Sequence, residues 1–155
     1  MVAMHRLINE LAEQGDMLPR ALSEMYENLR DYYVVEAEGQ LVACCALHIC
    51  WDDLAEVRSL AVDEQVRMRG LGRALVDRCL AEAADLGLGQ VFTLTLQPQF
   101  FERLGFRRVD VGNLPRKIWG ECFRCPKFPN CDEVALVRSP GETHLAAAAV
   151  AAAED

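Results

Sequence analysis

The segment from Arg67 to Gly72 (RMRGLG) joins a run typical of a strand to a run typical of a helix. Glycines at positions 70 and 72 allow the backbone to approach a ligand closely. The first amides of the following helix have no partners inside it, and they present the positive end of its dipole. The sequence therefore predicts an anion-binding turn here, called the glycine turn below, and a diphosphate is a suitable ligand.

Two common phosphate-binding motifs do not match the glycine turn. A nucleotide P-loop requires Gly-x4-Gly-Lys-Ser/Thr, but Gly72 is followed by Arg73 and Ala74. The dinucleotide motif Gly-x-Gly-x-x-Gly requires a third glycine where Leu75 stands. What remains is Arg-x-x-Gly-x-Gly, which a glycine-rich turn before a surface helix would also satisfy.

The surroundings of the turn resemble those found in the GNAT N-acetyltransferase superfamily. A strand-like run ends before the turn, an alanine- and leucine-rich helix follows it, and VFTLTL (91–96) and FFERLGF (100–106) come next. The resemblance implies that acetyl-CoA is the cosubstrate, that its pyrophosphate binds at the turn, and that the FFERLGF element closes the cofactor groove. The predicted cofactor-binding residues are Leu60, Ala61, Val62, Arg67, Met68, Arg69, Gly70, Leu71, Gly72, Arg73 and Phe101.

Glu56 is the candidate general base that removes a proton from an ammonium acceptor. Strand alternation would place Glu56, Arg58, Leu60 and Val62 on one face, so that the carboxylate faces the cofactor. The resemblance supports this role, because several family members use a glutamate at the matching position, directly or through water. The alternative is a solubilising charge on an edge strand, paired with Arg58.

The same resemblance assigns the oxyanion contact to the backbone N–H of Leu60, because the strands beside the cofactor splay in this fold. The pantetheine would then lie along residues 60–62. The general acid is harder to assign, since many relatives have tyrosine where this chain has Phe101. The Thr95 hydroxyl could support the sulfur, although threonine also simply favours strands. A thiolate can leave unaided near its own pKa.

The flanking segments resemble the acetyltransferase domain of bacterial N-acetylglutamate synthases. They are MLPR (17–20), LRDYYV (29–34), CCALH (44–48) and NLPRKIW (113–119). The resemblance implies acetylation of the α-amino group of L-glutamate by direct transfer, as in arginine biosynthesis. Arg20 matches the family's basic position before the second helix, and Arg58 and Lys127 flank the inferred pocket. Each of the three could instead be a solvated surface charge.

Two alternatives to a glutamate acetyltransferase remain open. One is a GNAT enzyme for another small amine or a protein N-terminus. The other is a non-catalytic protein that binds acyl-CoA or senses redox state, for which Phe101 and the cysteines near residue 125 are the arguments, while Glu56 argues against it. The larger synthases also carry a kinase-like domain that binds arginine, for which this chain is too short, so a stand-alone form is expected.

Three of the seven cysteines, Cys122, Cys125 and Cys131, have spacings that a zinc or iron–sulfur site could use. A fourth ligand is not evident, although His48 or His144 could complete a tetrahedral site. No metal is therefore assigned, and zinc, a disulfide or redox response, and reduced thiols stay open. The other four fall in strand or helix patterns and are expected to be small core residues, namely Cys44, Cys45, Cys50 and Cys79.

Composition agrees with one compact enzyme domain over residues 1–140. The chain has 155 residues and 52% hydrophobic content, which suffices for a substantial core. Its net charge of −8 argues against nucleic-acid binding. No signal peptide is evident, and outside the alanine-rich tail at 141–155, expected to be frayed or disordered, no stretch of about 18 residues is apolar and uncharged. We expect a cytoplasmic protein with a small-molecule amine as partner and a homodimer left open.

The elements that position these residues follow from hydrophobic periodicity and turn residues. With the resemblance, they predict an α+β GNAT fold whose central, mostly antiparallel sheet is flanked by helices. The first strand of the family is shortened to Val2-Ala3 or absent, so the assigned start codon is open to question. Helices are expected over Met4–Gln14, Pro19–Leu29, Gly70–Leu86 and Pro98–Leu104. Strands are expected over Tyr32–Ala37, Leu41–Cys50, Leu54–Val62, Val91–Leu96, Arg107–Val111 and Asp132–Arg138.

Overall fold

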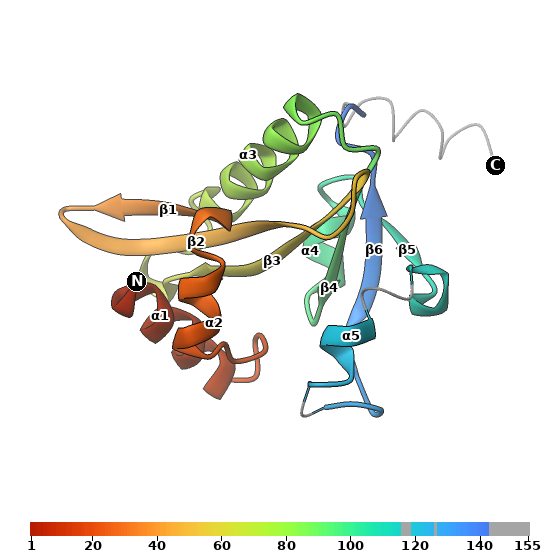
Figure 1. Cartoon of the computed structure of the whole chain (residues 1–155). Helices are drawn as coiled ribbons and strands as arrows, with labels where there is room; N and C mark the ends of the chain where they lie inside the picture. The colour runs from red at the N-terminus through yellow and green to blue at the C-terminus, as the bar shows by residue number, and fades with distance from the viewer. Residues whose placement is uncertain (116–118, 126, 143–155) are drawn as a thin grey trace.

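The computed structural model describes residues 1–115, 119–125 and 127–142 (Figure 1). Its six strands form one sheet in the order β1-β2-β3-β4-β6-β5. Of these neighbours, β3 and β4 are parallel and the others antiparallel, which confirms the predicted sheet. The strands are β1 (Tyr32–Ala37), β2 (Gln40–Ile49), β3 (Leu54–Val62), β4 (Gln90–Thr95), β5 (Arg107–Val109) and β6 (Val134–Arg138).

Helices cover both faces of the sheet (Figure 1). The long helix α3 packs on one face against Ala43, Cys45 and Leu47, and α1 packs on the other face against Cys44. None of the helices in the described part of the chain has the length and apolar character needed to cross a bilayer. The helices are α1 (Val2–Glu13), α2 (Leu22–Glu27), α3 (Leu71–Asp85), α4 (Pro98–Glu102) and α5 (Trp119–Cys122), with single 3-10 turns η1 (Leu29–Asp31), η2 (Glu64–Val66) and η3 (Val111–Asn113).

The first helix forms because its apolar residues recur at intervals of three and four. Met4, Leu7, Ile8 and Leu11 are buried on one side, as this spacing predicts. The helix begins at Val2, so the short strand suggested for Val2-Ala3 is not formed. The predicted core cysteines Cys44, Cys45 and Cys79 are fully buried, whereas Cys50 is partly exposed.

The second helix is shorter than the predicted range Pro19–Leu29. Asn9 of α1 explains its late start: its side-chain amide donates to the Arg20 carbonyl at 3.1 Å, and its carbonyl oxygen accepts from the Arg20 N–H at 3.3 Å. These bonds engage the backbone just before the helix, and Ala21 is extended. Pro19 therefore precedes the helix instead of lying in its first turn, and Arg20 is tied to α1.

Strands β3 and β4 separate after a short parallel contact. Their register pairs Leu54–Glu56 with residues 90–92, and Glu56 is the last β3 residue to have a β4 partner. Beyond that point β4 continues beside β6 as far as Thr95, and Figure 1 shows β3 and β4 diverging. The splay expected from the family resemblance is therefore present, and Glu56 lies at its apex.

A β-bulge interrupts the pairing of β3 with β2. Ala46 is opposite Arg58 and Cys44 is opposite Ala61, so two residues of β3, Ser59 and Leu60, oppose a single residue of β2. Ser59 has a φ of +54°, in the left-handed region that non-glycine residues seldom adopt. A bulge of this kind locally disrupts the ladder and leaves the extra residue without a partner there.

The bulge shows that the predicted common face of Glu56, Arg58, Leu60 and Val62 is wrong. Leu60 and Val62 pack with the cluster on the α3 face that contains Val57, whereas Ala61 packs with the α1 cluster. Because one inserted residue inverts the alternation of a strand, Leu60 and Val62 do not share the face of Glu56 and Arg58.

Candidate active site

A cleft of about 1040 Å³ opens where β3 and β4 diverge. It extends from the start of α3 past β3 to the segment before α2 and to residues 122–133. Of the predicted site residues, Ala61, Arg69 and Lys127 do not line it. Those that do are Arg20, Glu56, Arg58, Leu60, Val62, Arg67, Met68, Gly70, Leu71, Gly72, Arg73, Thr95 and Phe101.

The two glycines of the glycine turn are needed for different reasons. Gly70 is the N-cap of α3 with a φ of +79°, and a Cβ there would meet open space, so backbone conformation is the constraint. At Gly72 a Cβ would lie 3.3 Å from Cζ of Phe100, so close packing is the constraint. Both line the cleft, where the unpaired amides of the first helical turn favour an anion.

Arg67, at the start of the glycine turn, and Arg73, just after it, already have partners. Arg67 Nη2 lies 2.8 Å from Asp16 Oδ2, and its Nε donates to the Val62 carbonyl at 3.4 Å. Arg73 Nε lies 3.6 Å from Asp77 Oδ2 on α3. Exposed ion pairs contribute only about 0–1 kcal/mol, so either arginine can exchange its carboxylate for a phosphate.

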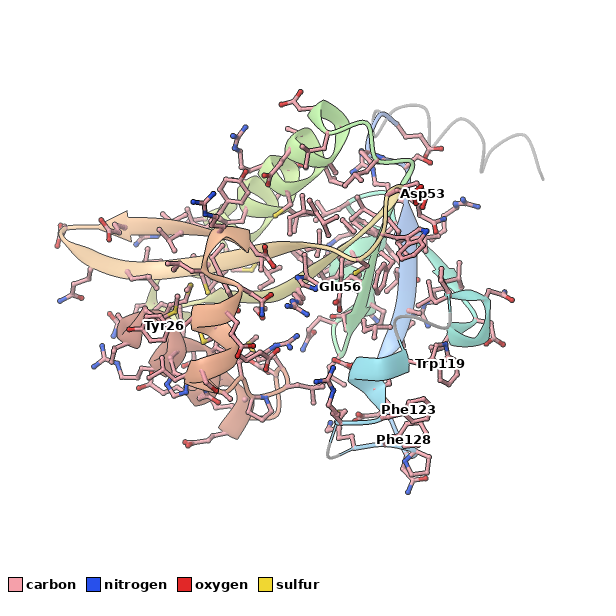
Figure 2. The ribbon with its side chains drawn as sticks, viewed as in Figure 1. Tyr26, Asp53, Glu56, Trp119, Phe123 and Phe128 are labelled. Carbon is pink, nitrogen blue, oxygen red and sulfur yellow. The ribbon has the colours of Figure 1, made fainter. Side chains whose placement is uncertain are left out.

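Glu56 is a buried carboxylate beside a buried arginine. The residue is 7% exposed, and its Oε2 lies 3.7 Å from Arg58 Nη1. Figure 2 shows Glu56 at the centre of the sheet, near the divergence of β3 and β4. A buried charge requires compensation, which Arg58 supplies. The pairing with Arg58 is therefore present, but on a central strand and not as a solubilising edge charge.

Arg20 brings a second positive charge to the same end of the cleft. Its Nη1 lies 2.6 Å from Glu24 Oε1. Burial acts to lower the pKa of Arg20, but the carboxylates of Glu24 and Glu56 outweigh it and raise that pKa. Burial also raises the pKa of Glu133, and Arg20 partly opposes this effect. Arg20 is thus electrostatically linked to both Glu56 and Glu133, although the three are far apart in sequence.

The residues considered for the oxyanion and the leaving group differ in what they can offer. Leu60 lies at the bulge, where the ladder with β2 is interrupted. Thr95 lines the cleft, and its Oγ1 accepts from the N–H of Gln97 at 2.9 Å. Phe101 is buried and packs edge-to-face on Phe100 and Phe106, with ring centroids 5.1 and 5.3 Å away. Phe101 therefore builds the cleft wall and supplies no proton.

Lys127 does not reach the cleft wall. Its ammonium lies 2.8 Å from Asp132 Oδ1, within the same loop. This ion pair raises the pKa of Lys127 and lowers that of Asp132. Lys127 therefore flanks the cleft without lining it, although Lys127 and Arg20 both lower the pKa of Glu133 against the larger effect of burial.

The cysteines Cys122, Cys125 and Cys131 are free thiols, and all three line the cleft. Within residues 1–115, 119–125 and 127–142, no group of three or more His, Cys, Asp or Glu side chains could hold a metal ion. His48, considered as a fourth ligand, has its Nδ1 2.6 Å from Asp31 Oδ2, and His144 lies outside the described residues, as do residues 143–155 of the alanine-rich tail. Burial raises the pKa of Cys122 and of Cys131.

Sequence reasoning missed Ser59. It lines the cleft, and its buried Oγ has no hydrogen bond of ordinary geometry to a described residue. It is close enough to Tyr32 to lower that phenol's pKa, against the larger effect of burial, which raises it. No glycine signals the bulge in the sequence. The signal that exists, a small polar residue in an otherwise apolar strand end, is too weak to predict it.

Sequence reasoning also missed an aromatic cluster at the rim of the cleft. Phe123 packs between Trp119 and Phe128, with ring centroids 6.5 and 5.0 Å away, and Figure 2 shows the three rings beside α5. Phe123 is 65% exposed, and of the three rings it is Phe128 that lines the cleft. Only the Phe128 edge of this cluster therefore borders the cleft.

Comparison with known proteins agrees with this architecture. A model of the acetyltransferase (GNAT) domain matches residues 28–108. The uncharacterized N-acetyltransferase CT2212 of Chlorobaculum tepidum is 40% identical over 137 residues, which cover 88% of each chain. An amino-acid acetyltransferase of Mycobacterium tuberculosis is 38% identical over 111 residues, which cover 70% of this chain and 64% of that protein.

Among solved structures, a similar fold is that of N-acetylglutamate synthase from Neisseria gonorrhoeae, complexed with coenzyme A and N-acetyl-glutamate. The TM-score is 0.81 at 24% identity, over 92% of this chain and 33% of that one. The shared part therefore corresponds to one third of the larger protein, and the likeness concerns the fold.

Proposed function

The chain belongs to the GNAT family of acetyl-CoA-dependent N-acetyltransferases, and on that premise we propose that it acetylates the α-amino group of L-glutamate. One observation carries the proposal: a single cleft contains the glycine turn at one end and, at the other, the buried carboxylate of Glu56, with Arg58 beside it and Arg20 within electrostatic reach. The first suits the diphosphate of coenzyme A. The second suits an amine that also carries carboxylates.

The transfer proceeds in the gap between β3 and β4. The diphosphate binds the amides at the start of α3, and the pantetheine lies along β3 beyond the bulge. The Leu60 N–H then donates to the carbonyl oxygen of the thioester as the amine attacks. Glu56 accepts the ammonium proton, because its carboxylate is at the apex of the splay and lines the cleft.

Arg20 and Arg58 distinguish a dicarboxylate from other amines. Both line the cleft near Glu56, and an arginine has five N–H donors, so Arg20 can keep Glu24 while it binds a substrate carboxylate. A polyamine would instead bring positive charge towards two guanidinium groups. The name amino-acid acetyltransferase of the mycobacterial relative supports the same class of acceptor.

The test is a coenzyme A release assay across amino acids, polyamines and peptides, with the wild type and Glu56→Gln. We expect turnover with glutamate and a loss of at least about 100-fold in Glu56→Gln, as for removal of a general base. Glu10→Gln, an exposed site on α1, is the matched control. Turnover with polyamines or peptides alone would overturn glutamate as acceptor. Acetyl-CoA binding without any turnover would favour a sensor.

We further propose that this reaction serves arginine biosynthesis in the cytoplasm. Complementation of a bacterial strain that cannot make N-acetylglutamate tests the pathway, and Glu56→Gln should fail to restore growth without arginine. Sedimentation analysis of the purified protein tests whether the chain forms the homodimer left open above.

A further inference from the structure

We propose that His48 and Asp31 form the route by which the proton taken up by Glu56 leaves the active site. The inference rests on the proposed role of Glu56 as general base. It assigns a function to two residues that lie outside the cleft wall, on β2 and in η1. His48 is a positioning and relay residue here, since it contacts neither substrate nor cofactor in the proposed reaction.

The register of the sheet places His48 directly beside Glu56. The two are Cα partners in the antiparallel pair β2–β3. Their neighbours Leu47 and Val57 are paired in the same way and both pack in the α3-side core, so His48 and Glu56 share the opposite face. Side chains of directly opposed residues on one face have Cβ atoms about 4.5–5.5 Å apart. His48 is therefore the cross-strand neighbour of the proposed base.

Asp31 is the third group in a row that begins with Glu56 and His48, and it lies outside the cleft wall. His48 Nδ1 lies 2.6 Å from Asp31 Oδ2, so the ring donates its Nδ1 proton to the carboxylate. The Glu56 side chain is 9% exposed, whereas those of His48 and Asp31 are 24% and 23% exposed. Glu56 lines the cleft, and His48 and Asp31 are not among the residues that do. The row thus leads from a buried carboxylate to groups in contact with solvent.

The chemistry requires such an exit. An ammonium acceptor loses two protons when it becomes an amide, and the coenzyme A thiolate takes up one of them. Each turnover therefore releases one proton. At that moment the product still occupies the cleft, which Glu56 lines, so the proton has to leave by way of His48 instead. A route along this face of the sheet, from β3 to β2, allows Glu56 to be deprotonated again without waiting for the cleft to empty.

An imidazole suits this position. It is more basic than a carboxylate, so proton transfer from a glutamic acid to a neutral imidazole is favourable. The bond to the Asp31 carboxylate favours the Nδ1-protonated tautomer, in which Nε2 is the nitrogen that can accept a proton. The charged groups beside His48 include Asp31 from η1 and, from β3, Glu56 with its partner Arg58. Asp31 stabilises the imidazolium and accepts its Nδ1 proton for release to solvent, after which proton exchange with solvent returns the ring to the Nδ1-protonated tautomer.

The experiment compares His48→Ala, His48→Gln and Asp31→Asn in the full chain, with glutamate and acetyl-CoA. We expect His48→Ala to lower kcat about tenfold, less than loss of the base itself, with an unchanged KM for acetyl-CoA. Added imidazole, which fits the space that alanine leaves, should restore kcat. Asp31→Asn should show a smaller loss. His5→Gln on α1 is the control for loss of a histidine outside this row.

A wild-type kcat in both His48 variants would overturn the relay, as would a loss that imidazole does not restore in His48→Ala protein of unchanged melting temperature. If His48→Ala does not fold, a wild-type kcat in Asp31→Asn overturns the proposal. The outcomes are separable from those of the proposed function. An active Glu56→Gln would overturn the base itself, whereas an inactive Glu56→Gln beside normal His48 variants would overturn only the relay.

Discussion

The two walls of the cleft are built from the chain in different ways. The wall expected to bind the cofactor comes mainly from one continuous stretch, residues 59–73, and offers mainly backbone groups at a bulge and at a helix start. The opposite wall combines Arg20, before α2, with Glu133 and the segment around Cys125, and offers side chains. Recognition by backbone is therefore local in sequence, whereas recognition by side chains depends on tertiary structure that brings distant residues together.

The largest effect that would test this contrast is expected at Gly72. In Gly72→Leu the side chain would enter the space occupied by Phe100, since even a Cβ lies 3.3 Å from that ring. Overpacking costs about 1–3 kcal/mol, which corresponds to a roughly 5- to 150-fold weaker affinity for coenzyme A if the turn distorts. Titration calorimetry measures this affinity, and Gly141→Leu, at an open site, is the control. Unchanged affinity in folded Gly72→Leu would place the diphosphate elsewhere.

The same contrast explains how much of the fold could be predicted. The sheet and α3 follow from alternation and helical periodicity, which are local properties of the chain, so their ranges differ from the structure by only a few residues. The second helix was predicted too long because the contact of Asn9 with the Arg20 backbone joins segments that are distant in sequence. The bulge at Ser59 is not predicted, because a glycine in a strand would indicate an unusual backbone conformation, whereas a serine does not.

The candidate site divides in the same manner. The glycine turn is predicted from a short motif and Glu56 from its place on the strand together with the family resemblance, and both line the cleft. Lys127 flanks the cleft without lining it, and its ion pair with Asp132 lies within one loop. The sequence does not predict a role for Glu133, because nothing in a single sequence indicates that the residue before a closing strand interacts with Arg20.

A smaller effect is expected on the opposite wall at Arg20. Arg20→Gln removes a charged donor near Glu56 and should raise the KM for glutamate about tenfold, the loss expected for one hydrogen bond to a charged group. The affinity for coenzyme A should not change, because the residue lies at the other end of the cleft. Steady-state kinetics and calorimetry together measure both quantities. Arg6→Gln, exposed on α1, is the control, and a parallel loss of coenzyme A affinity would contradict separate walls.

Thiol alkylation should sharpen the contrast further. Because burial raises the pKa of Cys122 and Cys131 above the usual 9.0, their thiolates form only at higher pH, so alkylation should accelerate as the pH rises towards and beyond that value. N-ethylmaleimide should lower glutamate turnover several-fold, and glutamate should protect better than coenzyme A. Mass spectrometry identifies the modified residues, and the buried Cys44, Cys45 and Cys79 serve as internal controls. Better protection by coenzyme A would place these thiols on the cofactor wall.

The smallest effect concerns the stability of the bulge itself. Ser59 holds a φ of +54°, a conformation that costs a non-glycine residue of order 1 kcal/mol. Ser59→Gly relieves this strain but gives the unfolded chain more freedom, so the two effects offset each other and the free energy of unfolding should change by less than about 1 kcal/mol. Ser59→Val keeps a side chain where β-branching is most strained, and it should destabilise by more than the glycine variant. Urea denaturation measures both, and equal stability of the two variants would mean that positive φ at residue 59 is not required for the bulge that separates the faces of Glu56 and Leu60.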